Sequence, residues 1–265
     1  MFDALYIGAT GMQAQQTSLE TIANNVANVN TAGFKRAKVG FTDLMAHEVA
    51  RAAQPMVDPL QSGILGSTAR LGAGVGISSV SRVFESGELK GTNAPMDVAI
   101  RGDGFIEVAL PDGTPAFTRG GTLKINRDGL LAHASGHPIK PGLSIPENAE
   151  SVAIAADGRV QVRLPGQANP IDVGQIELVR FAGAGALAAM GDNLFRASEG
   201  SGEPILARAG EDGAGLFAQG FLESSNVKMV DEMVSLMLAQ RGYEASVKVV
   251  QAADEMLGLV NNLRK

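Results

Sequence analysis

Hydrophobic residues recur at helical spacing at the beginning of the chain, over residues 1–30. Most members of this stripe follow one another at seven-residue intervals. A seven-residue repeat of apolar side chains is typical of a helix that packs along a partner helix. The pattern therefore predicts an N-terminal helix with one apolar face. That face consists of Leu5, Met12, Leu19, Ile22, Val26 and Val29.

The other faces of this helix carry few charges. Up to Phe34 the only charged side chains are Asp3 and Glu20, whereas a solvated helix normally carries Glu and Lys on its outer face. Amides and hydroxyls can be buried when they are hydrogen-bonded. We therefore expect protein to surround this helix on most sides, with an ordinary amphipathic helix of a globular core as the alternative. Further assembly contacts are assigned to Asn24, Asn25, Asn28 and Phe34.

A second helical pattern covers residues 222–265, with Ser224 and Ser225 as predicted caps. Its apolar residues step by three and four, shift phase by one residue after Met237, and continue to the end. A 3.6-residue helix accumulates such a shift against a strict heptad. At about 1.5 Å per residue the helix spans roughly 60 Å, so it needs a partner, and we expect the first helix to be that partner. Assembly residues are assigned here to Val227, Val234, Leu238, Val249, Met256 and Leu259.

Between the helices the pattern changes to strand spacing. From residue 77 to 221, short alternating or apolar runs are separated by turn residues. Asp112-Gly113, Asp128-Gly129 and Asp157-Gly158 are typical of hairpin turns. The region therefore predicts an antiparallel β-domain. Its expected strands cover residues 97–101, 105–110, 116–118, 151–155, 159–164 and 175–181.

Residues 35–76 fit neither pattern and are rich in Gly, Ser, Pro and Ala. So long an irregular segment is uncommon inside a compact domain, and we interpret it as an extended arm that reaches a neighbouring subunit. A short helix over residues 41–53, and a flexible bend over residues 72–76 ahead of a strand over residues 77–83, are expected.

The predicted fold class is α+β. Residues 1–34 and 222–265 form paired, coiled-coil-like terminal helices, residues 35–76 form the connecting arm, and residues 77–221 form the central antiparallel β-domain. Terminal helices that need protein around them imply assembly with other copies.

Composition limits this picture further. The chain has 265 residues and 45% hydrophobic residues, enough for a folded core. It has no cysteine, so disulfides and thiolate metal sites are excluded. A net charge of -6 argues against a nucleic-acid partner, and no apolar run is long enough to span a bilayer. With 33 Gly and 5% aromatics, an aromatic-rich core is not expected.

Candidate chemistry is sparse. His133 and His137 flank a predicted turn, which favours a hairpin over a metal site. Neither a nucleophile elbow nor a phosphate-binding loop is present, so we expect no enzyme activity, no metal and no cofactor. Lys35, Arg36 and Lys38 form a small basic group, interpreted as a solvated turn or as a contact with acidic groups of a neighbouring copy.

The segment from Ala23 to Arg36, ANNVANVNTAGFKR, resembles the N-terminal signature of the flagellar rod and hook family. Its asparagines in fixed register and its closing Gly-Phe-Lys-Arg carry the resemblance. One departure is Gly242, where the family usually has Ala. Residues 97–105, 117–131, 224–227, 240–245 and 253–257 resemble further signatures of the family, so the likeness covers nearly the whole chain.

The resemblance implies a structural subunit that self-assembles into a rigid hollow helical shaft, the rod of a bacterial flagellum, and transmits motor torque to the hook. Chain length and the arm favour the distal part of the rod over the hook, with a proximal rod subunit as the alternative. A β-rich oligomeric binding or adhesive module is the alternative from another class.

The resemblance also implies where the chain works and what it meets. It implies export through the flagellar export apparatus without a cleaved signal peptide, and a place in the rod across the periplasm. The implied partners are other copies of the chain, the proximal rod proteins, the hook protein and the surrounding L- and P-ring proteins. Nucleic acid and a membrane-embedded state are not expected.

Overall fold

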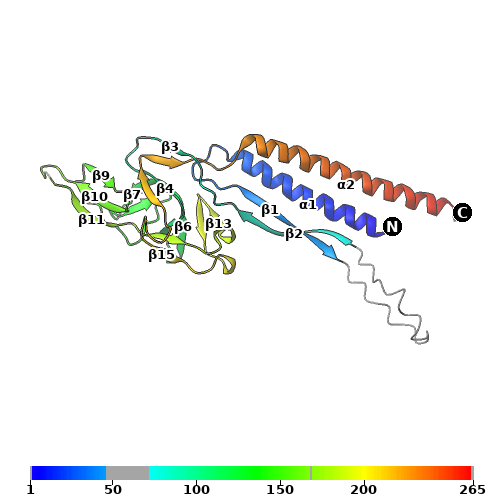
Figure 1. Cartoon of the computed structure of the whole chain (residues 1–265), viewed down its shortest axis with the longest axis horizontal. Coiled ribbons are helices and arrows are strands. Elements are labelled where there is room, and N and C mark those ends of the chain that lie inside the picture. The colour runs from blue at the N-terminus through cyan, green and yellow to red at the C-terminus, as the bar shows by residue number, and fades with distance from the viewer. Residues whose placement is uncertain (1, 46–71, 168, 264–265) are drawn as a thin grey trace, which may run out of the picture. The chain divides into compact units, whose positions relative to one another are not determined.

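The computed structural model describes residues 2–45, 72–167 and 169–263. These residues divide into two compact units (Figure 1). The helical unit contains residues 1–24, 38–80 and 230–265, and the β unit contains residues 25–37 and 81–229. The fold class is α+β, as predicted, with the terminal helices in contact and the sheets between them in sequence.

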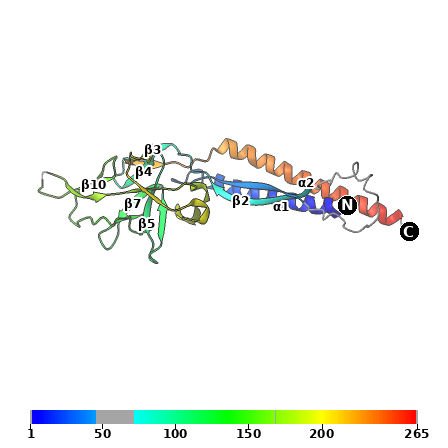
Figure 2. The ribbon, with the colours of Figure 1, turned by 60° about the horizontal axis from the view of Figure 1, so that its bottom comes forward.

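The helical unit is built from two long helices and a two-stranded sheet. Figures 1 and 2 show the two helices side by side and antiparallel. Asp3 in the first turn of one helix, and Asp231 and Glu232 in the first turn of the other, complement the positive helix N-termini. The elements are α1 (Phe2–Ala27), α2 (Met229–Leu263), β1 (Ala37–Met45) and β2 (Gly72–Arg82).

Both helices are shorter than predicted at the end that leads into the β unit. α1 ends at Ala27, and Gly33 then takes a positive φ of 74°, which turns the chain away from the helix. α2 begins at Met229, because residues 221–223 pair with another strand. The predicted cap Ser225 instead accepts a hydrogen bond from the Val227 N–H at 3.3 Å, in a turn ahead of the helix.

The predicted arm contains regular structure at both of its ends. Residues 41–45 belong to β1 rather than to a helix, and residues 72–76 belong to β2 rather than to a bend. β2 also confirms the strand predicted over residues 77–83. β1 and the first residues of β2 were missed because the two strands pair across a long stretch of sequence. The rest of the predicted arm and helix, residues 46–71, lies outside the described residues.

The β unit contains four sheets, and every strand ladder resolved among its described residues is antiparallel. In spatial order the six-stranded sheet is β13 (Ala188–Gly191), β14 (Leu194–Arg196), β6 (Pro115–Thr118), β5 (Phe105–Ala109), β12 (Leu178–Arg180) and β15 (Ile205–Ala207). The four-stranded sheet is β16 (Leu216–Gln219), β4 (Asp97–Arg101), β7 (Gly120–Ile125) and β8 (Leu131–His133).

Two smaller sheets and two 3-10 helices complete the β unit. The three-stranded sheet is β11 (Ile171–Gln175), β10 (Arg159–Arg163) and β9 (Ser151–Ile154), and the two-stranded sheet is β17 (Phe221–Glu223) and β3 (Leu89–Gly91). The 3-10 helices are η1 (Ala184–Ala186) and η2 (Glu199–Ser201). Each strand predicted from the sequence overlaps an observed one, because alternation and turn residues are local signals.

The β unit has an aliphatic core and a separate aromatic cluster. The aliphatic core includes the fully buried Ile106, Val160 and Leu178. The main core is aliphatic, as expected from the low aromatic content, and five of the ten phenylalanines gather in the separate cluster. They pack edge to face, the arrangement that aromatic rings prefer. They are Phe84, Phe105, Phe117, Phe181 and Phe195.

Candidate functional site

The two long helices meet through small residues. A Cβ placed on Gly8 would lie 2.6 Å from Cγ2 of Val250, and one placed on Gly11 would lie 3.1 Å from Oγ of Ser246. At Gly242, where the family usually has Ala, a Cβ would lie 3.1 Å from Cδ of Gln15. The helix axes therefore approach more closely than helices with larger side chains at these points allow. The glycines, together with the buried Ala14, Ala239 and Ala253, form this contact.

The predicted apolar stripe of α2 faces away from this contact. The prediction that the two helices pair is confirmed, but the prediction that this apolar stripe faces α1 is wrong. Leu238 is 68% exposed and Leu259 is 65% exposed. The remaining members are exposed as well, and they are Val234, Ala245, Val249, Ala252 and Met256.

α2 thus carries two faces with heptad spacing. The inner face, toward α1, consists of Leu236, Ala239, Ser246, Val250, Ala253 and Leu257, which are buried or half-buried. The outer face consists of Val234, Leu238, Ala245, Val249, Ala252, Met256 and Leu259. The two repeats are offset by one position, since Leu238 precedes Ala239 and Ala245 precedes Ser246. A helix with two such faces can pack against two partners.

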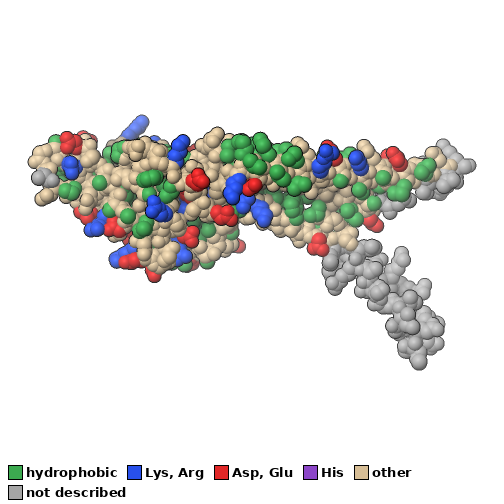
Figure 3. All heavy atoms as spheres, turned by 45° about the horizontal axis from the view of Figure 1, so that its top comes forward, with side chains coloured by type: hydrophobic (Ala, Val, Ile, Leu, Met, Phe, Trp, Pro, Cys, Tyr) green, Lys and Arg blue, Asp and Glu red, His purple; other side chains and the backbone are tan. Residues whose placement is uncertain are grey.

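Further exposed apolar side chains lie near the start of the outer face. Val230, Met233 and Met237 are exposed beside Val234 and Leu238. Figure 3 shows hydrophobic side chains gathered over the N-terminal half of α2. Contiguous apolar surface of this kind marks an interaction site more often than chance exposure.

The apolar stripe of α1 is only partly covered. Leu5, Met12 and Leu19, all in the helical unit, are half-buried, whereas Ile22 is buried. Thr10 lies beside β2, because a Cβ on Gly74 would overlap its side chain. The stripe is therefore only partly covered at every predicted position except Ile22.

Several predicted assembly residues are engaged within the chain itself. Asn25 is buried, and its amide both donates to Ala37 O and accepts from the Ala37 N–H, at 2.9 Å each. Asn28 accepts a hydrogen bond from the Thr31 hydroxyl at 3.1 Å, and Asn24 is exposed. Three further predicted residues, Val26, Phe34 and Val227, lie in the β unit, and of these Phe34 and Val227 are buried.

A buried ionic cluster in the β unit was missed by the sequence analysis. Lys35 is fully buried, and its ammonium lies 2.8 Å from the Glu223 carboxylate, which also pairs with Arg119 at 3.3 Å. Both interpretations of Lys35, a solvated turn and a contact with a neighbouring copy, are therefore wrong. Burial lowers the pKa of Lys35, and the charge of Glu223 partly offsets this effect.

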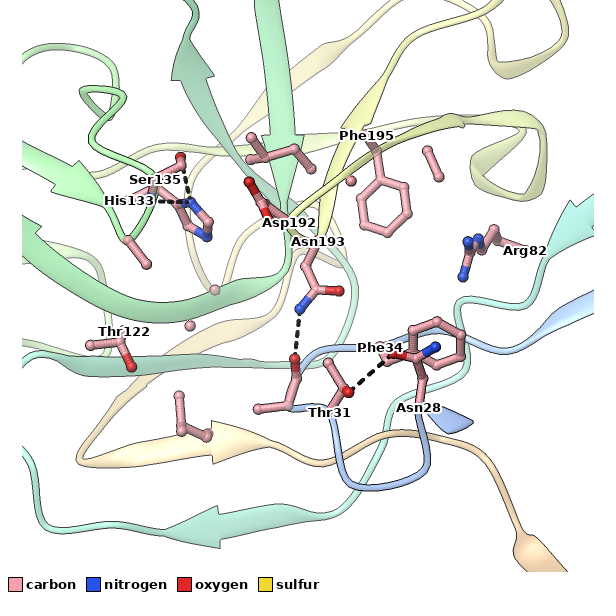
Figure 4. A pocket seen from close by; sticks show the side chains of 18 residues that line it. Asn28, Thr31, Phe34, Arg82, Thr122, His133, Ser135, Asp192, Asn193 and Phe195 are labelled. Atoms are coloured by element: carbon pink, nitrogen blue, oxygen red, sulfur yellow. Dashed lines mark hydrogen bonds between the residues drawn. The ribbon is translucent and has the colours of Figure 1, made fainter. Parts of the chain in front are cut away.

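A pocket of about 670 Å³ lies in the β unit (Figure 4). His133 and Ser135 lie at one end, and Phe34 and Arg82 lie at the other. Nδ1 of His133 lies 2.9 Å from the Ser135 hydroxyl, and burial lowers the pKa of this histidine. As predicted, His133 and His137 bracket a hairpin turn, because the His133 N–H donates to His137 O at 2.9 Å.

The described residues supply little else that carries chemistry. Among them no group of three His, Cys, Asp or Glu side chains lies close enough to hold a metal ion. No helix in the described part of the chain is both long and apolar enough to cross a membrane. The distinctive features are therefore the exposed helix faces and the buried ionic cluster.

Three protein-family models match the chain. The flagella basal body rod protein model matches residues 5–35, which cover most of α1 and continue to Lys35. The flagellar hook protein FlgE/F/G D1 domain model matches residues 99–162, from β4 to β10. The flagellar basal body rod FlgEFG protein C-terminal model matches residues 218–263, which include β17 and α2.

Known relatives match over the full length. The flagellar basal-body rod protein FlgG of Borreliella burgdorferi is 42% identical over 100% of both chains. FlgG of Caulobacter vibrioides is 42% identical over 98% of this chain and 99% of its own, whereas FlgF of the same organism is 31% identical over 98% and 100%. The chain therefore belongs to the FlgEFG family of flagellar rod and hook proteins.

Within this family the chain groups with FlgG. The identity to FlgG of Caulobacter vibrioides is higher than the identity to FlgF of the same organism. The chain is a structural protein of the distal rod of the flagellar basal body, in a family that is not enzymatic.

Proposed function

We propose that copies of this chain assemble into a rigid, hollow helical shaft that transmits motor torque to the hook. The observation that supports this proposal most strongly is the outer face of α2. A contact between different surfaces of successive copies generates a helical assembly of open length when its rotation does not close into a ring.

The outer face is suited to such a contact because it stays exposed when α1 and α2 pair. Burying apolar surface stabilises an interface by about 25 cal/mol per Å², or about 1.5–3 kcal/mol for one fully buried Leu. Leu238 and Leu259 are each more than 60% exposed. Burying them against another copy would therefore contribute most of this free energy. On α1, the half-buried Leu5, Met12 and Leu19 extend the proposed interface.

The buried predicted residues take an indirect part in this proposal. Ile22, Asn25, Phe34 and Val227 are covered by their own chain, so they hold the ends of the helices in place rather than contact another copy. Asn24 and Asn28 remain proposed contacts that fix the register between copies.

The other proposed partners follow from the place of the rod in the basal body. They are the proximal rod proteins, the hook protein and the L- and P-ring proteins. We propose that the chain reaches its place in the periplasm through the flagellar export apparatus, without a cleaved signal peptide. Family membership supports these assignments.

The interface is tested by placing a charge on the outer face. We expect Leu238→Glu and Leu259→Glu to raise the critical concentration for polymerisation about 10- to 100-fold, because each substitution removes about 1.5–3 kcal/mol of apolar burial. Sedimentation and electron microscopy of the purified chain measure this concentration.

Gln240→Glu is the matched control, because Gln240 is an exposed polar residue of the same helix. It adds the same charge and should polymerise like the original chain. Polymerisation of both leucine variants at the original concentration would refute the role of the outer face.

A further inference from the structure

The chain passes between the two units four times, and the β-unit segments next to these crossings are tied together. The crossings follow residues 24, 37, 80 and 229. The adjoining segments of the β unit are residues 25–37, 81–88 and 223–229. All the contacts described below lie within the β unit.

Asn25 makes the first tie, between the two ends of one segment. Its side chain forms two hydrogen bonds of 2.9 Å with the backbone N–H and C=O of Ala37. Residues 25 and 37 are the first and last of their segment. The amide therefore joins two of the four crossings directly.

Asn226 makes the second tie, which joins all three segments. Its Oδ1 accepts from the Arg36 N–H at 2.8 Å, and its Nδ2 donates to Val83 O at 2.8 Å and to Glu85 O at 3.2 Å. One side chain of residues 223–229 thus bonds to the backbone of each of the other two segments.

Glu223 makes the third tie, and its charge is compensated. The carboxylate accepts from Lys35 Nζ at 2.8 Å and from the Gly87 N–H at 2.9 Å, and Lys35 Nζ also donates to Glu85 O at 2.7 Å. Arg119 donates to Glu223 at 3.3 Å and to Gly104 O at 2.8 Å. This arginine links the three segments to the sheets of the β unit.

The hydrogen bonds of these ties depend on direction, a property that apolar contacts lack. Apolar contacts are non-directional, whereas hydrogen bonds weaken steeply when they bend. A buried ion pair contributes little net stability compared with an apolar replacement, because desolvation opposes it. The directional bonds of this cluster can therefore fix geometry without adding much net stability.

We propose that Lys35, Glu223 and Asn226 form a torsional joint, which keeps the three segments from turning against one another while the rod carries load. They are positioning residues, because they hold the three segments in a fixed arrangement where the chain crosses between the units. This inference rests on the proposed function, because it assumes that torque passes between the two units.

Lys35→Met tests the joint in the full-length chain. It removes the ties from Lys35 to Glu223 and Glu85 but leaves Glu223 paired with Arg119, so no buried charge is left uncompensated. We expect the backbone amides of Gly33, Val83 and Asn226, all bonded across these segments, to exchange hydrogen about tenfold faster. Amides of β4 and β5 should exchange at the original rate.

Lys140→Met is the matched control. Lys140 pairs with Glu107 at 2.6 Å, but its side chain is largely exposed and lies outside the joint. This variant should leave the exchange of Gly33, Val83 and Asn226 unchanged. Unchanged exchange of these amides in Lys35→Met, or equally faster exchange in the sheets, would overturn the joint, since the second result indicates a general loss of structure.

A second measurement addresses the load itself. In cells that carry Lys35→Met in place of the original chain, we expect swimming speed to fall more steeply with medium viscosity than in Lys140→Met cells. Failure of Lys35→Met to build rods while its sheet amides stay protected also supports the joint, because the crossings are then misplaced. Rods in normal number with an unchanged response to viscosity would refute it.

The two proposals fail in different ways. Failure of the original chain to polymerise would refute the proposed function. Normal polymerisation of the original chain, together with normal exchange and normal swimming of Lys35→Met, would refute the joint alone.

Discussion

At the scale of single residues, Asn25 belongs to a group of asparagines that the sequence assigned as contacts between copies. In the structure its side chain closes a loop of its own chain, because it satisfies both backbone groups of Ala37. Its place in the signature is therefore explained by local folding.

Whether Asn25 acts within its own chain or between copies can be measured. We expect Asn25→Ala to lower the free energy of unfolding by about 1–3 kcal/mol, because it leaves two backbone groups without their partner. Asn30→Ala, at an exposed position of the same signature, should stay within about 0.5 kcal/mol. Urea denaturation followed by circular dichroism gives both values. Full stability of Asn25→Ala combined with failed polymerisation would show instead that Asn25 acts as a contact between copies.

The burial of Lys35 and its pairing with Glu223 could not be predicted from the sequence. A lysine between Phe34 and Arg36 has the local signal of a solvated turn. Its partner Glu223 lies 188 positions away, and no periodicity connects the two. Only the fold brings them together, so the buried ionic cluster was not predictable from spacing.

At the scale of elements, the sequence predicted the strands better than the helix faces. Alternation and turn residues located β4, β5, β9 and β10 to within a residue or two, because these signals act locally. Apolar periodicity also located α2, but it could not show which face meets α1. Large apolar residues usually lie inside, but here Leu238 and Leu259 are exposed and the small residues Ala239 and Ala253 are buried.

The close helix contact gives a second test. Gly8→Ala places a Cβ 2.6 Å from Val250 Cγ2, and overpacking of this kind costs about 1–3 kcal/mol. The substitution should therefore lower the melting temperature of the helical signal of the polymer, although Ala favours helix by about 1 kcal/mol. Combining it with Val250→Ala should recover part of the loss, since the two sites are coupled.

Gly258→Ala is the control for that experiment. Gly258 also lies in α2, but a Cβ there would meet nothing within 4 Å. It should stabilise the helix by about 0.5–1 kcal/mol. An equal gain from Gly8→Ala would show that the helices do not meet at this glycine.

At the scale of the whole molecule, the two units differ in what stabilises them. The β unit has a buried aliphatic core and an aromatic cluster of its own. The helical unit buries mainly small side chains between its helices and leaves large ones exposed. Because helices in proteins depend mostly on packing, the helical unit depends more on assembly.

Assembly should therefore increase helix content. We expect the isolated chain to show less helical circular dichroism than the polymer, with a gain of up to the 26 residues of α1 and the 35 residues of α2. The β-sheet signal should stay constant. Full helix content in an isolated chain that does not polymerise would contradict both this expectation and the rod assembly.

The one-residue offset between the two faces of α2 makes the length of this helix as important as its composition. A single inserted residue near Met229 would rotate everything after it by about 100°. Leu238, Ala245 and Ala252 would then occupy the positions of Ala239, Ser246 and Ala253. Bulky Leu238 would be driven against α1, and Met237 and Glu244 would take over the surface offered to the next copy. Insertions and deletions in α2 should therefore be tolerated far less well than substitutions.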